Sequence, residues 1–255
     1  MRLIDTHTHL YLKEFEKDFD EVLQRARNAG VQKFYLPCID SAVINDMLAL
    51  EESYPSEFFS MMGLHPCYVK ADFLDELKVI EEYLSKRKFA AIGEIGLDFY
   101  WDTSFKEEQF EAFNVQMELA LQYKSPVVIH TRNAIKETIE AVKPFAAKGL
   151  KGIFHCFGDN YETAKEITTL GFSLGIGGVL TYKKANIAES VKDIPIEYIV
   201  LETDAPYLSP VPFRGKRNES SYLSYIAETL AKAKNMTVEE IAEITSANAE
   251  KIFLY

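Results

Sequence analysis

Eight short apolar runs recur along the chain, and segments with helical periodicity separate them. Several runs are apolar almost throughout, as strands buried on both faces of a parallel sheet must be. The runs cover residues 2–5, 33–38, 58–64, 89–95, 126–130, 151–155, 172–176 and 198–203. Parallel strands that alternate with helices in this number close into a (β/α)8 barrel. The sequence therefore predicts an α/β protein of the TIM-barrel class.

Residues that begin and end helices agree with this pattern. Gly30, Gly149 and Gly171 stand where helices should stop, in a left-handed conformation that glycine adopts without strain. Residues 104–107 and 237–240 read as capping boxes, in which a hydroxyl and a carboxylate satisfy free backbone N–H groups. These signals agree with helices between the apolar runs.

We expect residues 1–255 to form one domain. No Pro/Gly/Ser-rich linker, repeat or low-complexity tract divides the chain. The last helix, about 237–252, is expected to add packing or to close the barrel. The competing fold is an open doubly wound sheet, which places its ligand at a single switch point. A closed barrel is favoured because it brings polar residues from many strands to one mouth.

All five histidines follow strand-like runs: His7, His9, His65, His130 and His155. Alternate residues of a strand point to the same side, so His7 and His9 present two imidazoles to one point. A single such pair also occurs at ordinary strand ends, but histidines used as filler would scatter over helices and loops. The pattern favours a metal site.

Two carboxylates obey the same rule. Glu94 follows the run 89–93, and Asp204 follows the run 198–203. Imidazole nitrogens and carboxylate oxygens at strand ends form a ligand set suited to zinc or manganese, while magnesium prefers oxygen ligands. We therefore expect divalent metal ions at the C-terminal mouth of the barrel.

Composition limits the classes of partner. The formal charge of −11 argues against broad electrostatic binding to nucleic acid, but a local basic loop and bound cations can reverse the potential at one cleft. No apolar stretch approaches the roughly 20 residues that span a bilayer, and no signal peptide is recognised. Three cysteines without a C-x-x-C spacing predict reduced thiols. We expect a cytoplasmic monomer that does not bind membranes.

The polar segments together resemble the TatD family of metal-dependent deoxyribonucleases, which belongs to the amidohydrolase-like barrels. The similarity runs in order from Ile4 to about Asn218, through Asp5–His9, Gly63–Pro66, Gly93–Asp98, His130–Arg132, His155–Phe157, Glu202–Leu208 and Arg214–Asn218. Ser220 departs from the proline that the family often has there, which removes no chemical group.

The resemblance implies two divalent ions, whether zinc, manganese or magnesium. It assigns His7, His9, Glu94 and Asp204 to the first ion, and Glu94, His130 and His155 to the second. A bridging carboxylate offsets the repulsion between two cations, and two such ions can activate water and polarise a phosphoryl oxygen together. Glu94 and Asp204 are the expected catalytic residues, with Asp204 accepting the proton of the attacking water.

Five residues are expected to bind substrate phosphate. Arg132 has a guanidinium whose fork matches phosphate, and Arg214, Lys216 and Arg217 lie on a loop after the last strand, where such barrels often bind phosphate. His65 resembles a family histidine near the site and is expected to contact phosphate or water. The alternative for Arg132 is a surface ion pair, and the alternative for Arg214, Lys216 and Arg217 is a solvated loop.

Four further residues stay open. Asp5 and Glu202 each precede a predicted ligand by two residues and either orient a ligand histidine or are satisfied interior carboxylates. Cys156 is expected to point away from the metals. The only tryptophan, Trp101, is expected to pack against a neighbouring helix, with stacking of a terminal base as the alternative.

The predicted function is metal-dependent phosphodiester hydrolysis of DNA, at single strands or strand ends, because a narrow barrel mouth admits a terminus more readily than a continuous helix. The family resemblance favours 3′ to 5′ exonuclease action. One rival is an amidohydrolase or esterase acting on a small molecule or an aminoacyl-tRNA, because the same activated water attacks carbonyl carbon. The other is a barrel that keeps its metal without catalysis.

Overall fold

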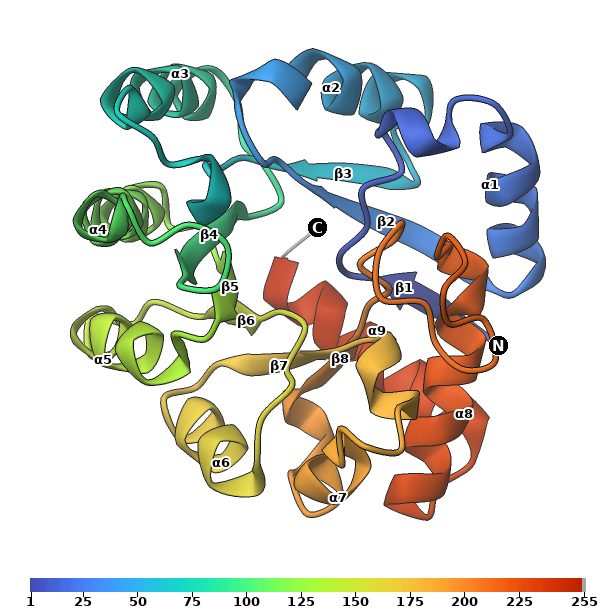
Figure 1. Ribbon diagram of the computed structural model, residues 1–255. Coiled ribbons are helices and arrows are strands. Elements are labelled where there is room, and N and C mark those ends of the chain that lie inside the picture. The colour runs from blue at the N-terminus through green and yellow to red at the C-terminus, as the bar shows by residue number, and fades with distance from the viewer. Residues whose placement is uncertain (254–255) are drawn as a thin grey trace.

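The computed structural model describes residues 1–253 and shows, within that range, eight parallel strands around a central axis (Figure 1). The strands are β1 (Leu3–Asp5), β2 (Val31–Pro37), β3 (Phe58–Met61), β4 (Ile92–Asp98), β5 (Val127–Arg132), β6 (Gly152–Phe154), β7 (Ser173–Ile176) and β8 (Ile199–Leu201). They pair in order as β1–β3 and β4–β8. Single parallel bridges, Met62 to Ile92 and Thr8 to Ala205, join the two groups and close the (β/α)8 barrel.

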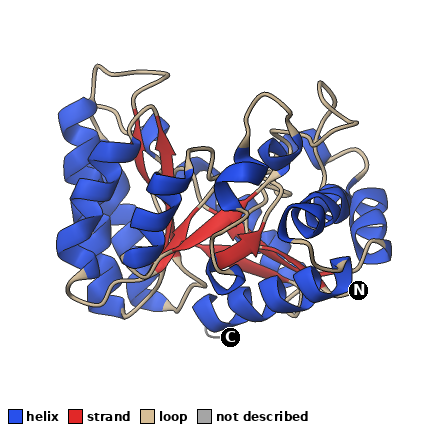
Figure 2. Ribbon diagram, turned by 90° about the horizontal axis from the view of Figure 1, so that it is seen from below, coloured by secondary structure: helices blue, strands red, loops and turns tan. Residues whose placement is uncertain are grey.

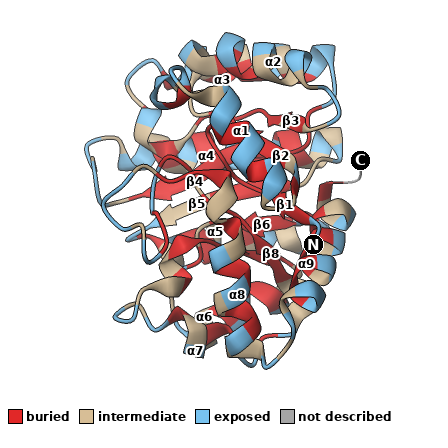
Figure 3. Cartoon of the chain, turned by 90° about the vertical axis from the view of Figure 1, so that its right-hand side faces the viewer, coloured by how far each residue is buried: buried red, intermediate tan, exposed pale blue. Residues whose placement is uncertain are grey.

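Helices α1 to α8 surround the strands on the outside, and α9 lies across one end of the barrel (Figures 1 and 2). They are α1 (Phe19–Asn28), α2 (Ile44–Ser53), α3 (Phe73–Lys86), α4 (Lys106–Tyr123), α5 (Ile135–Ala146), α6 (Tyr161–Thr169), α7 (Ile187–Val191), α8 (Leu223–Lys234) and α9 (Val238–Phe253). Their apolar stripes pack on the strands, and their polar faces stay in solvent (Figure 3). No helix in residues 1–253 is both long and apolar enough to cross a membrane.

The last helix closes the end of the barrel opposite the strand C-termini. Ala249 and Phe253 of α9 pack with inward residues of the barrel, including Ile4, Val128 and Val200. The ring of Phe253 stacks on that of Tyr35 at 3.8 Å between centroids. Helix α9 is seen within the ring of strands in Figure 1. The expected closing helix is confirmed, and it leaves the opposite mouth as the place for a site.

Local expectations hold at most helix ends. Gly30, Gly149 and Gly171 all have positive φ, at 93°, 93° and 85°. The box at residues 237–240 is confirmed, because the Thr237 N–H donates to Glu240 and the Glu240 N–H donates to the Thr237 hydroxyl.

The box at residues 104–107 is wrong. Asp102 accepts the Ser104 N–H in a turn of its own, and α4 begins only after Phe105, which gives no side-chain cap.

The fourth strand also differs from its prediction. It was expected over 89–95, with Glu94 near its end, but β4 runs from Ile92 to Asp98. The pairing of β4 with β5 shifts register between Ile92 and Ile95, at the position of Glu94. Such an irregularity re-aims a side chain. Glu94 therefore projects into the mouth from inside a strand, and the strand continues to a second carboxylate, Asp98.

Candidate metal centre

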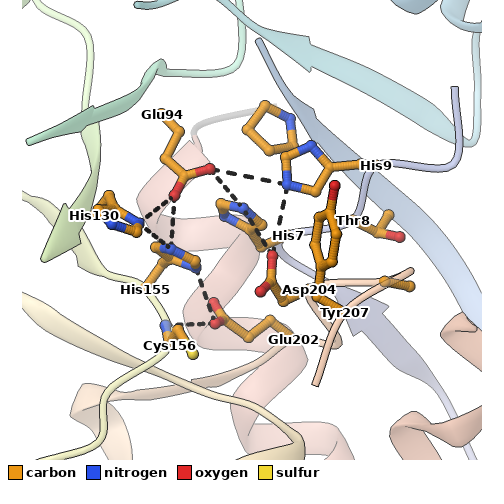
Figure 4. A network of polar contacts seen from close by, with 12 residues as sticks. His7, Thr8, His9, Glu94, His130, His155, Cys156, Glu202, Asp204 and Tyr207 are labelled. Carbon is orange, nitrogen blue, oxygen red and sulfur yellow. Dashed lines mark hydrogen bonds and ion pairs between the residues drawn. The ribbon is translucent and has the colours of Figure 1, made fainter. Parts of the chain in front are cut away.

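The predicted ligands meet at the C-terminal mouth (Figure 4). They come from five places along the chain: His7 and His9 just after β1, Glu94 in β4, His130 in β5, His155 after β6 and Asp204 after β8. Their side chains are buried or nearly so. Because barrel strands all end at one mouth, distant sequence positions form a single cluster.

Glu94 lies between two groups of histidines and turns one oxygen to each. Oε2 is 3.1 Å from Nε2 of His7 and 3.9 Å from Nε2 of His9. Oε1 is 2.9 Å from Nδ1 of His130 and 2.8 Å from Nε2 of His155. A carboxylate placed in this way can join two cation positions, one beside each pair of rings.

Asp204 completes the first group. Its Oδ1 lies 3.6 Å from Nε2 of His7 and 3.5 Å from Nε2 of His9. Its backbone N–H donates to the His7 carbonyl at 2.9 Å, which ties the end of β8 to the end of β1. Burial opposes ionisation of Asp204, but the imidazoles around it lower its pKa. Asp204 is thus a carboxylate at neutral pH.

Hydrogen bonds fix which nitrogen of His9 is free. The Tyr11 hydroxyl donates to the Pro37 carbonyl at 2.6 Å, so it must accept from Nδ1 of His9 at 2.9 Å. The proton of a neutral His9 ring is therefore on Nδ1. Its Nε2 presents a lone pair to Glu94 and Asp204, as a metal ligand requires.

The same reasoning applies to His130. Nε2 of this ring lies 2.9 Å from Oδ2 of Asp98. Burial opposes the charge of Asp98, but hydrogen bonds from His130 and from backbone N–H groups lower its pKa, so the carboxylate accepts. Nδ1 of His130 is then the lone-pair atom, and it faces Glu94. Asp98 was not among the predicted site residues, although it stands four positions after Glu94 on the same side of the strand.

Glu202 performs a related task for His155. Its Oε1 lies 3.3 Å from Nδ1 of His155 and accepts the backbone N–H of Cys156. A Cβ on Gly175 would lie 2.1 Å from Oε2 of Glu202, so only glycine leaves room for this carboxylate. Glu202 therefore orients a ligand histidine, which was one of its two expected roles.

His65 differs from the predicted ligand histidines in that it points an N–H donor, not a lone pair, into the cluster. Its Nδ1 accepts the backbone N–H of Cys67 at 3.0 Å, so a neutral ring carries its proton on Nε2. Nε2 lies 3.3 Å from Oε1 of Glu94 and points a donor into the cluster. A protonated nitrogen cannot coordinate a metal, but it can donate to a substrate oxygen. This geometry suits the predicted phosphate contact.

Charge in the cluster is balanced around Glu94. Burial favours the neutral form of Glu94, but the imidazoles around it, His155 foremost, hold its pKa well below its usual range. Burial also opposes the charge on His155, but Glu94 and Glu202 raise the pKa of His155 well above its usual value. Burial and the neighbouring His155 lower the pKa of His7.

The residues fit a divalent cation. The ring nitrogens of His7 are buried without hydrogen-bond partners, which is costly unless something else satisfies them. Two sets of candidate ligand atoms lie within 4.8 Å of one another: His7, His155 and Asp204; and His7, His9 and Glu94. A third set, His65, Glu94 and His130, meets the same distance but includes the protonated Nε2 of His65. Imidazole lone pairs with carboxylates form the mixed donor set of zinc and related metals.

The predicted phosphate contacts differ in what they touch. Arg132 and Arg214 have no ion-pair partner within residues 1–253 and stack on tyrosines, Arg132 at 3.9 Å from the Tyr100 ring and Arg214 at 4.1 Å from the Tyr182 ring. Lys216 is exposed on the same loop as Arg214.

Arg217 is already engaged. It makes two hydrogen bonds to the carboxylate of Asp18, at 2.8 and 2.6 Å, and a third to the Glu14 carbonyl. Arg217 is therefore part of a surface ion pair, which is neither the expected phosphate contact nor the solvated loop that was its alternative. Arg132, Arg214 and Lys216 are thus free of carboxylate partners within residues 1–253. Arg217 instead joins the loop after β8 to the N-terminus of α1.

The remaining open residues are resolved by their contacts. Asp5 accepts from the Thr203 N–H at 2.9 Å and the Thr203 hydroxyl at 2.6 Å, so it joins β1 to β8 as an interior carboxylate. Cys156 belongs to none of the candidate metal groups found in residues 1–253. The expected packing of Trp101 is wrong, since 67% of this residue is exposed. Asp98 accepts the backbone N–H of Trp101 and so holds the turn that carries this exposed ring.

A barrel whose strand ends gather imidazoles and carboxylates in this arrangement has the form of a metal-dependent hydrolase. The family model described as TatD related DNase matches residues 4–254. YabD of Bacillus subtilis, named as an uncharacterized metal-dependent hydrolase, is 39% identical over 98% of each chain. YcfH of Escherichia coli K12, named in the same way, is 30% identical over 99% of this chain and 96% of its own. This chain belongs to the TatD family of metal-dependent hydrolases.

Solved structures agree. The TatD homolog YjjV of Escherichia coli K12 superposes with a TM-score of 0.93 at 30% identity, over 100% of this chain and 98% of its own. A TatD family hydrolase of Entamoeba histolytica has a TM-score of 0.85 at 25% identity, over 99% and 98% of the two chains. The predicted fold and family are confirmed.

Proposed function

We propose that this hydrolase cleaves phosphodiester bonds at the ends of single-stranded DNA, in the 3′ to 5′ direction. One observation carries the proposal: cations without a carboxylate partner stand at the end of β5, two residues after His130, and on the loop that follows Asp204, in an acidic protein. Arg132, Arg214 and Lys216 have no carboxylate partner within residues 1–253, although the net charge is −11. Cations left unpaired at the mouth favour a polyanionic substrate.

The ligand set supports two divalent ions, one on either side of Glu94. When bound, such ions lower the pKa of water and neutralise charge on phosphoryl oxygens. The protein supplies the rest of the chemistry. Asp204, ionised and within the first group, is placed to take the proton of the attacking water. The Nε2–H of His65 and the guanidinium of Arg132 are the donors available to the phosphate.

Single-strand ends fit the mouth better than an uninterrupted duplex, because the ligands are buried at the base of the loops. The 3′ to 5′ direction rests on the family resemblance. We further propose that the enzyme acts as a cytoplasmic monomer, in which the mouth is open to substrate.

The test uses 5′-labelled oligonucleotides and metal-loaded enzyme, with Glu94→Ala as the inactive control. We expect a ladder shortening from the 3′ end of single-stranded DNA, and much slower cleavage of a blunt duplex. Parallel reactions use RNA of the same sequence, an aminoacyl-tRNA and a panel of carboxylic esters. Ester hydrolysis without cleavage of DNA would make the protein an amidohydrolase. Metal binding without hydrolysis of any substrate would leave it a non-catalytic barrel.

A further inference from the structure

Two aromatic side chains stand exposed on the turn after β4. Trp101 is 67% exposed and Tyr100 is 52% exposed. Their rings meet edge to face at 4.9 Å between centroids, so one face of the tryptophan has no ring against it in residues 1–253. Large exposed aromatic surface on a soluble protein commonly marks a binding site. Metal binding and proton transfer make no use of these rings.

The turn is tied to the metal centre through one residue. Oδ1 of Asp98 accepts the backbone N–H of Tyr100 at 2.9 Å and that of Trp101 at 3.1 Å. Oδ2 of the same carboxylate accepts from His130, a predicted metal ligand, at 2.9 Å. One buried carboxylate therefore sets the position of the ligand ring and of both aromatic residues. Substrate that touches the rings also lies beside the centre.

A free cation completes the surface. Arg132 pairs in register with Asp98 across β4 and β5, and its guanidinium lies 3.9 Å from the centre of the Tyr100 ring and 5.2 Å from that of Trp101. The stack fixes the planar group, and no carboxylate among residues 1–253 binds it. Tyr100, Trp101 and Arg132 form what we call the aromatic platform: two π faces beside one unpaired cation.

We propose that the aromatic platform binds a nucleobase of the strand that enters the mouth, with the base stacked on Trp101 and an adjoining phosphate bound by Arg132. This rests on the proposed function and adds the requirement for an unpaired base near the scissile bond. Every base has a π face, so stacking is tolerant of sequence and excludes paired bases. The alternation of ring and cation matches the alternation of base and phosphate. A protein partner would use the rings but would leave the unpaired guanidinium without a phosphate.

Trp101 is the only tryptophan in the chain, so intrinsic emission reports on this surface alone. The first test titrates the metal-loaded protein with a single-stranded phosphorothioate oligonucleotide, which resists cleavage. A second oligonucleotide of equal length and charge has abasic sites at its 3′ end. We expect saturable quenching by the first and little by the second. Equal quenching by both, or binding seen by anisotropy without a change in emission, would overturn the proposal.

The second test compares protein variants on two substrates, the normal oligonucleotide and the abasic one. Trp101→Ala should raise KM for the normal oligonucleotide by about 5- to 100-fold, the range of one lost base stack. Trp101→Phe should restore most of this affinity. The abasic substrate should bind wild type and Trp101→Ala equally. Tyr83→Ala, which removes an aromatic ring from the outer helix α3, serves as the control and should change nothing.

The outcomes separate this proposal from the proposed function. Normal KM in Trp101→Ala with DNA cleavage intact would reject the base site and keep the nuclease. Failure to bind or cleave any nucleic acid would reject both. Emission that changes with protein concentration alone, together with a dimer in solution, would make the aromatic platform an interface between copies and reject the base site.

Discussion

The carboxylate of Asp98 accepts a hydrogen bond from Nε2 of His130 at 2.9 Å, which leaves Nδ1, 2.9 Å from Oε1 of Glu94, as the nitrogen that a cation would use. The ligand atom of this histidine is thus chosen by a residue that belongs to none of the candidate metal groups found in residues 1–253. Groups that orient ligand histidines commonly change metal affinity by 10- to 100-fold when they are lost.

Asp98→Asn should weaken binding of the ion beside His130 by about 10- to 100-fold. The amide oxygen can still accept the Tyr100 and Trp101 N–H groups, but its NH2 would face Nε2 of His130 and move the ring proton to Nδ1. Metal titration by calorimetry measures the effect. Asp102→Asn, which loses only the ion pair with Lys70, is the control. Unchanged metal affinity in Asp98→Asn would remove Asp98 from the centre.

Metal uptake should release protons. Burial opposes the charge on His155, but Glu94 and Glu202 raise its pKa well above the usual value, so the metal-free ring is protonated at neutral pH. A cation binds only the neutral ring. We therefore expect metal affinity to rise with pH, by up to about tenfold per unit while His155 is protonated.

Calorimetry in two buffers of different ionisation enthalpy counts the released protons. Glu202→Gln removes one of the two carboxylates that hold the proton on His155, and should release fewer. Affinity that does not change over about pH 6 to 8 would contradict the charged state of His155.

How far the sequence predicts this molecule depends on the kind of feature. The barrel and the gathering of histidines and carboxylates at strand ends follow from periodic patterns, because strand alternation and strand-end position are local properties. The family resemblance, not the pattern, separates the six predicted ligands from His65. Glu94 was assigned to the end of a strand and lies inside β4, since a register shift depends on the neighbouring strand. Its position was wrong, although its side chain does reach the cluster.

Contacts between loops could not be predicted from the sequence. The ion pair of Arg217 with Asp18 joins segments that are far apart in the chain, and nothing local distinguishes this arginine from Arg214. The exposure of Trp101 follows from two backbone hydrogen bonds to Asp98, which a propensity cannot reveal. Asp98 could have been predicted as a site residue, because it lies four residues after Glu94, a spacing that puts both side chains on the same side of a strand.

Lys234 should stabilise the fold without affecting the site. Its Nζ donates to the carbonyls of Val191, Lys192 and Ile194 at the end of α7, where backbone acceptors lack helical partners. Lys234→Met should lower the free energy of unfolding by about 1–3 kcal/mol, seen as a drop in Tm of about 2–4 °C for each kcal/mol. Lys232→Met, on the exposed face of the same helix turn, should be neutral. Equal Tm values for the two variants would refute this role.

Asp204→Asn separates binding from proton transfer. The amide keeps one oxygen for the first group but cannot take a proton from water, so turnover should fall by about 10²-fold or more. Metal should still bind, foremost beside His130 and His155. Metal content and rate are measured in the same preparation. Recovery of the wild-type rate in excess metal would show that Asp204 is a ligand only.

The central proposal is that Glu94, whose two oxygens face His7 and His155, would serve two cation positions. Native mass spectrometry of metal-loaded protein, with single-strand cleavage measured on the same sample, tests it most directly. We predict two ions in the wild type, loss of at least one in Glu94→Ala, and no turnover in that variant, with the folded state retained by circular dichroism. A wild type that reaches full activity with one ion, or a Glu94→Ala protein that keeps both ions and cleaves DNA, would contradict the account.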